Sequence, residues 1–585
     1  MSRPQRSQAE QQNPTSSLAA PPEPHVRTVF WVVALVLGLL QVWAHRNDVS
    51  PDGISYIEIA EAAGRNGLHA LVNGYWSPLY PFLLSLSFRI FHPTPYWEFT
   101  AVHFVNFGLY LANLICFEIF LRELLSARSN SGKAAGEFQP VAERIVSIWG
   151  YLFFLWSCQF WLSPAMTNPD LCVAGLVYLA TALLLRIHRG KGNWFLFGIL
   201  GAALGVAYLA KAAMFLVSLV FLLSSFFLYA SQCRSYRKAM TKTLLACGIF
   251  AAVAAPLVIA LSKEKHRATF GDSGKIAYAE YVNRATWLIH WQGEPPGTGV
   301  PAHPTRKIFS DPAVYEFSQP VPGSYPPWYD PSYWYEGIQP HFSLKGQLWV
   351  LFRAANAYLK LFSRSGALYV LFIALFVWVK KGGRWELRAR ELWWVWLPSL
   401  AALGMYALVL VEQRYVSGFA LMLLLWILSS VYVSERAGGE LGRRVVLATI
   451  LAPVIAVAWP VARDLKDVIL NEPYEPWVVA QQLHSMGISA GTDVGCVGGC
   501  LDAYWAHLAG VRVIAEIPDA EQGRFISADS ARKQLVFAVF SSVGARVVLT
   551  RNREAANPAD GWRQIPGTDH FIWEQPLLIA APERK

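Results

Sequence analysis

The chain has 585 residues, of which 54% are hydrophobic and only 15% are charged. Soluble domains carry roughly 25% charged residues, so this composition excludes an ordinary soluble protein. The apolar residues lie in long stretches, which predicts a polytopic membrane protein that is mainly α-helical. The formal net charge of +10 comes from Lys and Arg residues in short loops between these stretches. This pattern is the orientation signal of a membrane protein and argues against a nucleic-acid partner.

The apolar segments predict eleven membrane spans that follow a polar tail. Residues 1–27 are rich in Pro, Gln and Ser, and we expect them to form a disordered cytoplasmic tail. We expect the first span, 28–44, to be an uncleaved anchor, because the polar lead before it is long for a signal peptide. The other spans are expected at 99–121, 144–163, 170–186, 194–210, 212–230, 243–262, 366–379, 391–411, 415–433 and 444–460.

Two further apolar stretches, 77–91 and 345–363, are interrupted by proline, polar or charged residues, so we interpret them as interfacial helices. With this choice and a cytoplasmic N-terminus, every strongly basic loop lies on the cytoplasmic side, as the positive-inside rule requires. The loops 45–98 and 263–345 then share the external face with the C-terminal residues 461–585.

The chain changes in character after the last span. Residues 28–460 form the predicted transmembrane domain, whereas 461–585 alternate between strand and helix patterns and predict a small external α/β domain. Cys496 and Cys500 are spaced C-x-x-x-C there, and two unbonded thiols are the simplest interpretation, with a disulfide as the alternative. We expect no metal site at these cysteines, because no further ligands stand at suitable spacing.

Asp52 follows the first span and begins an amphipathic run in which Tyr56 lies on the apolar stripe. As a structural residue, Asp52 would be the N-cap of this helix. As a chemical group, a carboxylate at the membrane surface suits a general base, which must lie within hydrogen-bond reach of the proton that it takes. The sequence leaves both interpretations open.

Charged residues also stand at three other external turns. Asp170 begins a span, and it is either a helix N-cap or a functional acid at the edge of the hydrocarbon. Lys211 lies in an apolar run and either extends to the interface or holds a phosphate as a point charge. Glu412 and Arg414 precede Tyr415, and they form either a structural ion pair or a phosphate-binding site.

The order of these motifs resembles that of the GT-C membrane glycosyltransferases, the superfamily of the protein O-mannosyltransferases and the aminoarabinose transferase. The resemblance covers roughly residues 28–460. It rests on Asp52 after the first span, the S-Y-x-x-I-A helix with Tyr56, the aromatic-proline segment with Tyr75 and Trp76, Pro169-Asp170, the A-K-A-A segment at Lys211, and E-x-R-Y from Glu412 to Tyr415.

The resemblance implies an integral membrane glycosyltransferase of a bacterial inner membrane, with its active site facing the periplasm. Such an enzyme moves a sugar from a polyprenyl-phosphate donor to a hydroxyl of a glycan, lipid or protein acceptor by a single inverting displacement. Asp52 would be the base, Asp170 would orient a substrate, and Lys211 or Arg414 would hold the phosphate. The resemblance also places Tyr56, Tyr75, Trp76, Glu412 and Tyr415 in the substrate site.

One departure from the family pattern matters. Many protein O-mannosyltransferases have Asp-Glu at the catalytic position, where this chain has Asp52-Gly53. This difference weakens an assignment to protein mannosylation and leaves the use of a divalent metal open. The main alternative is a transporter or flippase of lipid-linked glycans, and the third is a non-catalytic membrane scaffold. The polar residues gather on one face and no internal repeat is visible, which favours the transferase.

Overall fold

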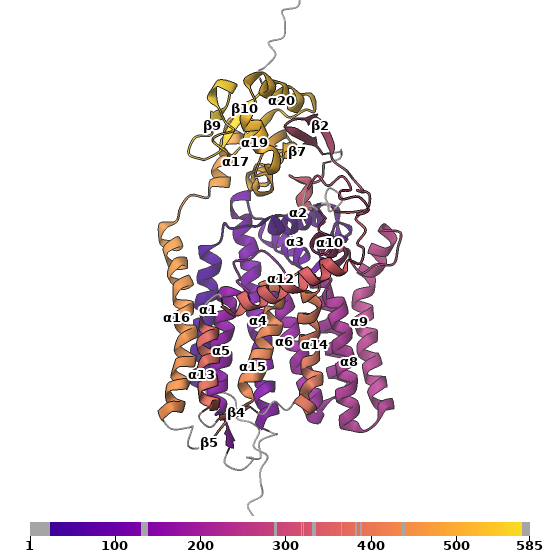
Figure 1. The fold of residues 1–585 in the computed structure, drawn as a ribbon, viewed down its shortest axis with the longest axis vertical. Coiled ribbons are helices and arrows are strands. Elements are labelled where there is room, and N and C mark those ends of the chain that lie inside the picture. The colour runs from indigo at the N-terminus through magenta and orange to yellow at the C-terminus, as the bar shows by residue number, and fades with distance from the viewer. Residues whose placement is uncertain are drawn as a thin grey trace, which may run out of the picture.

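The computed structural model describes residues 24–575 except 130–137, 286–288, 318, 320, 330–334, 364–365, 381–382, 386–388 and 435–439. Residues 1–23 of the expected tail, 1–27, therefore lie outside the described residues. A bundle of long helices runs along the long axis, and a smaller mixed α/β domain covers one end of the bundle (Figure 1).

Each of the eleven predicted spans coincides with one helix of the bundle. In lipid every backbone polar group must be satisfied within the chain, which is why these apolar segments are helical. By length and composition, α1, α4, α6, α8, α9 and α16 are long enough to cross a membrane, and the chain is an integral membrane protein. The bundle helices are α1 (Pro24–Ala44), α4 (Pro95–Ser129), α5 (Glu143–Phe160), α6 (Asp170–Arg186), α7 (Trp194–Ala210), α8 (Met214–Cys233), α9 (Tyr236–Glu264), α13 (Ala367–Lys380), α14 (Ala389–Ala407), α15 (Gln413–Ser429) and α16 (Glu440–Leu470).

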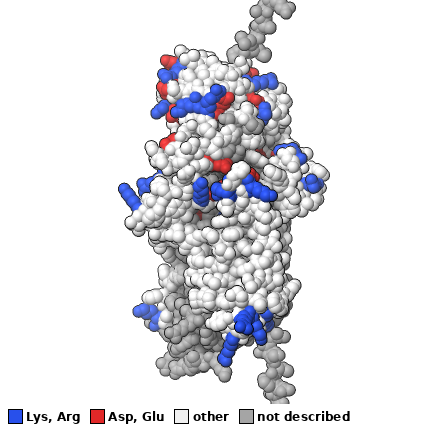
Figure 2. Space-filling model, turned by 90° about the vertical axis from the view of Figure 1, so that its right-hand side faces the viewer, with Lys and Arg blue, Asp and Glu red and all other residues white. Residues whose placement is uncertain are grey.

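Charge separates the two ends of the bundle. The helix connections rich in Lys and Arg join α4 to α5, α6 to α7, α8 to α9, α13 to α14, and α15 to α16. The described helix ends that these connections join all lie at the end opposite the α/β domain (Figure 1). Figure 2 shows a broad belt without charged side chains, with Lys and Arg at the lower end and mixed charges around the α/β domain. This belt is the surface expected to face lipid.

Three further helices lie outside the bundle, at the end that carries the α/β domain. They are α2 (Pro51–Asn66), α3 (Leu79–Phe91) and α12 (Leu344–Ser363). Figure 1 shows α12 lying across the bundle axis, with exposed Leu348, Phe352 and Leu359 on its surface. An exposed apolar stripe on a helix that crosses the bundle supports the interfacial interpretation of 345–363. Helix α3 packs against α2 and corresponds to 77–91.

Helix α16 continues to Leu470 before the chain enters the α/β domain. The sheet of this domain has seven strands in the order β2-β3-β7-β6-β8-β10-β9, in which β6 pairs in parallel with both β7 and β8. The strands are β2 (Arg306–Ser310), β3 (Ala313–Glu316), β6 (Asp493–Val497), β7 (Arg512–Ile517), β8 (Val547–Thr550), β9 (Arg563–Gln564) and β10 (Phe571–Glu574). The helices are α17 (Glu475–Ser485), α18 (Tyr504–Ala509), α19 (Asp519–Ser527) and α20 (Ser530–Ser542).

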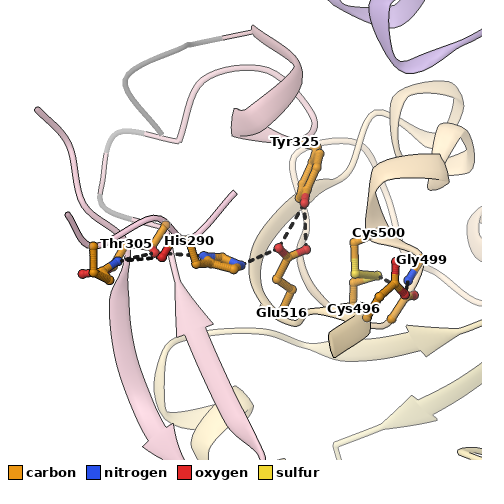
Figure 3. A network of polar contacts seen from close by, with 10 residues as sticks. His290, Thr305, Tyr325, Cys496, Gly499, Cys500 and Glu516 are labelled. Atoms are coloured by element: carbon orange, nitrogen blue, oxygen red, sulfur yellow. Dashed lines mark hydrogen bonds and ion pairs between the residues drawn. A yellow bond between two sulfur atoms is a disulfide. The ribbon is translucent and has the colours of Figure 1, made fainter. Parts of the chain in front are cut away.

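Strands β2 and β3 come from the external loop 263–345 and join the C-terminal sheet through β7. A buried polar network fixes this junction (Figure 3). His290 lies 2.6 Å from a carboxylate oxygen of Glu516 in β7, and the Tyr325 hydroxyl donates to the same carboxylate at 2.8 Å. The Thr305 hydroxyl lies 2.8 Å from the other ring nitrogen of His290. Because these groups are buried and satisfy one another, they hold the loop to the domain.

Cys496 and Cys500 form a disulfide at the end of β6 (Figure 3). The interpretation as two unbonded thiols is therefore wrong. Spacing did not decide the matter, because the turn after Val497 is what brings the two side chains together.

Candidate active site

Asp52 lies in the first turn of α2, but it does not cap the helix. The N-cap is Ser50, whose hydroxyl accepts a hydrogen bond from the Gly53 amide at 3.2 Å. The interpretation of Asp52 as the N-cap is therefore wrong, and its carboxylate is free to make other contacts. Its side chain is 38% exposed, at the junction between the membrane bundle and the external elements.

Asp170 is the first residue of α6, and its amide is capped by the Asn168 side chain at 3.0 Å. Its own carboxylate turns to the cations instead of capping the helix, so the N-cap interpretation is wrong here too. The Lys211 ammonium donates to Oδ1 of Asp170 at 2.6 Å, and the Asp170 side chain is only 3% exposed. A buried carboxylate of this kind needs a close cation, because burying an unpaired charge is costly.

Arg414 joins the two carboxylates. One terminal nitrogen donates to Oδ2 of Asp52 at 2.8 Å, and its Nε lies 3.8 Å from Oδ2 of Asp170. The same guanidinium donates to the Tyr415 hydroxyl at 3.3 Å, and the Lys211 ammonium lies 3.3 Å from the centre of the Tyr415 ring. Among the described ion pairs, none joins Arg414 to Glu412, so the predicted alternative of a Glu412–Arg414 pair is wrong.

The turn that carries Lys211 is held in place from outside. Lys211 follows α7, and the Ala212 amide donates to the Ser77 hydroxyl at 3.0 Å, which ties the turn to the first external loop. Burial opposes the charged form of Lys211 more strongly than Asp170 favours it, and Arg414 adds repulsion, so the pKa of Lys211 falls to about 8. The ammonium is therefore charged at neutral pH but close to its titration range.

Two cavities meet at Asp52 and Arg414. Cavity A, of about 670 Å³, is lined by Lys211 and by apolar residues that include Leu216 and Met405. Cavity B, of about 800 Å³, lies toward Thr167, Asn168 and Lys360. Both are lined by the same five residues at their common wall: Pro51, Asp52, Glu412, Arg414 and Leu501. A group held at this wall is accessible from both sides.

The structure brings most of the predicted residues to cavity A. Tyr75, Trp76, Lys211, Glu412, Arg414 and Tyr415 line it together with Asp52. Tyr56 is buried beneath it, with ring centres 5.0 Å from Trp76 and 5.1 Å from Tyr80. Tyr56 therefore supports the wall from behind, and Asp170 supports Lys211 and Arg414 in the same way.

Sequence reasoning missed some residues of the cavity. Glu280, from α10 (Ser273–Tyr281), lines cavity A beside Tyr281, and burial raises its pKa to about 7. Tyr406 joins them from α14. An acid in a short helix of a long loop gives no periodic or motif signal, so only the fold reveals its position.

Among the described residues, one group has the spacing of metal ligands. Glu61, Glu98 and His507 offer ligand atoms within 4.8 Å of one another, at the contact between α2, α4 and the external domain. His507 also lies 3.3 Å from Glu58 and 2.9 Å from Glu98. Burial opposes the charged imidazolium, but Glu98 and Glu58 outweigh it and raise the pKa of His507 well above its usual value. The protonated ring therefore already compensates these acids.

The arrangement is a GT-C-like fold, in which an external domain lies over the end of a helical membrane bundle that carries the site. No family model matches the chain, and no curated protein matches it. Among solved structures, the chain is similar to ArnT from Cupriavidus metallidurans bound to undecaprenyl phosphate. The identity is 12%, the TM-score is 0.53, and the match covers 96% of this chain and 99% of that one.

The chain also matches structures of an archaeal enzyme. The oligosaccharyltransferase AglB from Archaeoglobus fulgidus, in complex with an inhibitory peptide and a dolichol-phosphate, is 14% identical, with a TM-score of 0.45. That match covers 90% of this chain and 70% of the archaeal one. Because its TM-score is lower, the fold assignment rests on the similarity to ArnT alone.

Proposed function

We propose that this protein is a glycosyltransferase that moves a sugar from a polyprenyl-phosphate donor to an acceptor hydroxyl, with inversion at the anomeric carbon. The observation that carries the proposal is the position of Asp52, at the wall shared by two cavities and bonded to Arg414. A transferase needs a base that is accessible to an acceptor on one side and to a donor on the other.

Cavity A suits the donor. Its cations, Lys211 and Arg414, are suited to a phosphate, because both hold charge in a partly dry site. The apolar residues of α8 and α14 that complete the lining are suited to a polyprenyl chain. The binding of undecaprenyl phosphate by ArnT, a protein of the same fold, supports this choice of donor.

The mechanism follows from the two carboxylates. Among the described residues, Asp52 accepts a hydrogen bond on Oδ2 only, from Arg414, so Oδ1 is available for the acceptor hydroxyl. As Asp52 takes that proton, the acceptor oxygen forms a bond to the anomeric carbon, and the bond from this carbon to the phosphate oxygen breaks. The electron pair leaves with the phosphate, whose charge Lys211 and Arg414 stabilise. Asp170 positions both cations.

The charge distribution supports an orientation with the site outside the cytoplasm. The helices that the five basic connections join have their connected ends opposite Asp52, and basic loops stay in the cytoplasm. We place the protein in a bacterial inner membrane, with the site and the α/β domain on the periplasmic face, where a glycan, lipid or protein acceptor is accessible.

The test compares Asp52→Asn with Asp467→Asn, a control at the same end of the bundle but outside both cavities. Each is expressed at wild-type level in a strain that lacks the protein, and lipid-linked sugars and surface glycans are measured by mass spectrometry. We expect Asp52→Asn to lose one sugar from an acceptor and to retain its donor, while the control restores the wild-type profile. A wild-type profile from Asp52→Asn would refute Asp52 as base and favour the transporter or scaffold.

A further inference from the structure

A third cavity lies between the external domain and the first external loop. Cavity C, of about 570 Å³, is lined by Asp48 and Val49 of the loop and by Tyr474, Tyr504 and Arg551 of the domain. It is separate from the wall that holds Asp52, and the proposed chemistry does not use it.

The sheet topology explains why a cavity forms here. The chain passes from β6 to β7 on one side and later to β8 on the other side, and both pair with β6 in parallel. The connections that leave β6 and β8 therefore diverge at the carboxyl ends of these strands. In open α/β sheets this point is the usual ligand crevice. Cavity C lies there, because Gly498 and Gly499 follow β6, and Thr550 and Arg551 end or follow β8.

The lining does not suit a phosphate. Gly498 and Gly499 have φ of +63° and +65°, a turn whose amides bind anions in other proteins. Here the Gly499 amide donates to the Asp519 carboxylate at 2.5 Å, so the chain supplies its own anion; Figure 3 shows Gly499 beside the disulfide that closes this turn. The acids that line the cavity, Asp48, Glu475 and Asp502, outnumber the single arginine, Arg551. His570 is the other basic side chain of the lining, and burial lowers its pKa and so opposes its positive charge. The net charge of the lining is therefore negative.

The lining does suit a neutral ligand with many hydroxyl groups. Two tyrosine rings, from Tyr474 and Tyr504, stand beside carboxylate and guanidinium groups that form hydrogen bonds in several directions. The Tyr504 hydroxyl donates to Asp502 at 3.0 Å. The Tyr474 hydroxyl is buried and has no hydrogen-bond partner among the described residues, so it is the ring of Tyr474 that faces a ligand.

Cavity C also continues toward the reacting centre. Asp48 and Val49 line both cavity C and cavity B, and Asp52 follows four residues after Asp48. Four residues span at most roughly 14 Å, so a ligand of a few sugar units that extends from cavity C through cavity B can reach Asp52. We propose that cavity C is a carbohydrate-binding site that holds the distal sugars of a glycan acceptor, while its reacting hydroxyl lies at Asp52. This inference rests on the proposed transferase function and names the class of its acceptor.

The test uses Arg551→Ala and Tyr504→Ala in the full-length protein in lipid nanodiscs. Arg563→Ala is the matched control, because Arg551 and Arg563 are both exposed arginines paired with a glutamate of the same domain, and Arg563 lies outside cavity C. Arg551→Ala leaves Glu475 paired with His570, so we expect the domain to stay folded. The probe is the oligosaccharide released from surface glycans of a strain that lacks the protein, and its affinity and rate of glycosylation are both measured.

Loss of one charge-assisted hydrogen bond should raise the acceptor Kd and KM about tenfold, with kcat and the donor KM unchanged. An unchanged acceptor Kd and KM in Arg551→Ala would overturn the proposal, and so would equal changes of both constants in Arg563→Ala. Saturable binding of a peptide fraction, with no binding of the oligosaccharide, would also overturn it. If the wild type binds the oligosaccharide through Arg551 but transfers nothing, the carbohydrate site stands and the proposed function fails. If the wild type transfers sugar and Arg551→Ala leaves the acceptor Kd and KM unchanged, the proposed function stands and the carbohydrate site fails.

Discussion

Lys211→Met offers a sharp test of how the site stabilises the leaving phosphate. The substitution keeps most of the side-chain length and removes the charge that lies 2.6 Å from Asp170. At an effective dielectric constant of about 20, this contact represents about 6 kcal/mol of gross Coulomb attraction. Desolvation offsets part of it, and breaking such a buried pair usually costs about 3–5 kcal/mol of stability. Arg414, 3.8 Å from Asp170, partly replaces the lost partner and should keep the effect near the lower end.

The expected effect on catalysis is separate from the effect on stability. Removing one preorganised charge from a developing anion typically lowers kcat about 10²–10³-fold. Lys211→Met should show a loss of this size when kcat is measured with saturating polyprenyl-phosphate sugar on folded protein.

The double variant Lys211→Met, Asp170→Asn distinguishes the two roles. It removes the buried carboxylate together with its cation, so stability should recover. If Lys211 acts on the phosphate, kcat should remain low in the double variant. Recovery of both stability and kcat would refute the reasoning, because it would show that Lys211 serves only to neutralise Asp170.

Two further predictions concern titratable groups. Because the pKa of Lys211 is lowered to about 8, its phosphate-binding charge is present below that pH and is lost above it; donor affinity should fall as pH rises through about 8. Lys211→Arg should abolish this fall, and a wild-type affinity that stays constant from pH 7 to 10 would contradict it. His507→Ala should lower the free energy of unfolding of the external domain by about 3–5 kcal/mol, because it leaves the buried acids Glu58 and Glu98 without their cation. Thermal unfolding followed by near-ultraviolet circular dichroism measures this change, and Glu98→Gln in the His507→Ala background should restore part of it.

The membrane architecture could be predicted from the amino-acid sequence. Span length and the positions of basic loops are local properties, and they predicted all eleven bundle helices and a helix over each of 77–91 and 345–363. They also placed Asp52 and Arg414 at one end of the bundle, because the direction of each helix follows from the number of spans before it.

Which of these residues meet depends on how the helices pack, and no local pattern predicts it. Asp52 and Arg414 are 362 residues apart and bond at 2.8 Å, and Asp170 lies behind Lys211 instead of at the cavity wall. The joining of β2 and β3 to the C-terminal sheet was equally hidden. Hydrophobic period and charge describe a segment and its own surroundings, whereas such contacts form between helices that are distant in sequence. For that reason the residue types at this site could be read from the chain, but their partners could not.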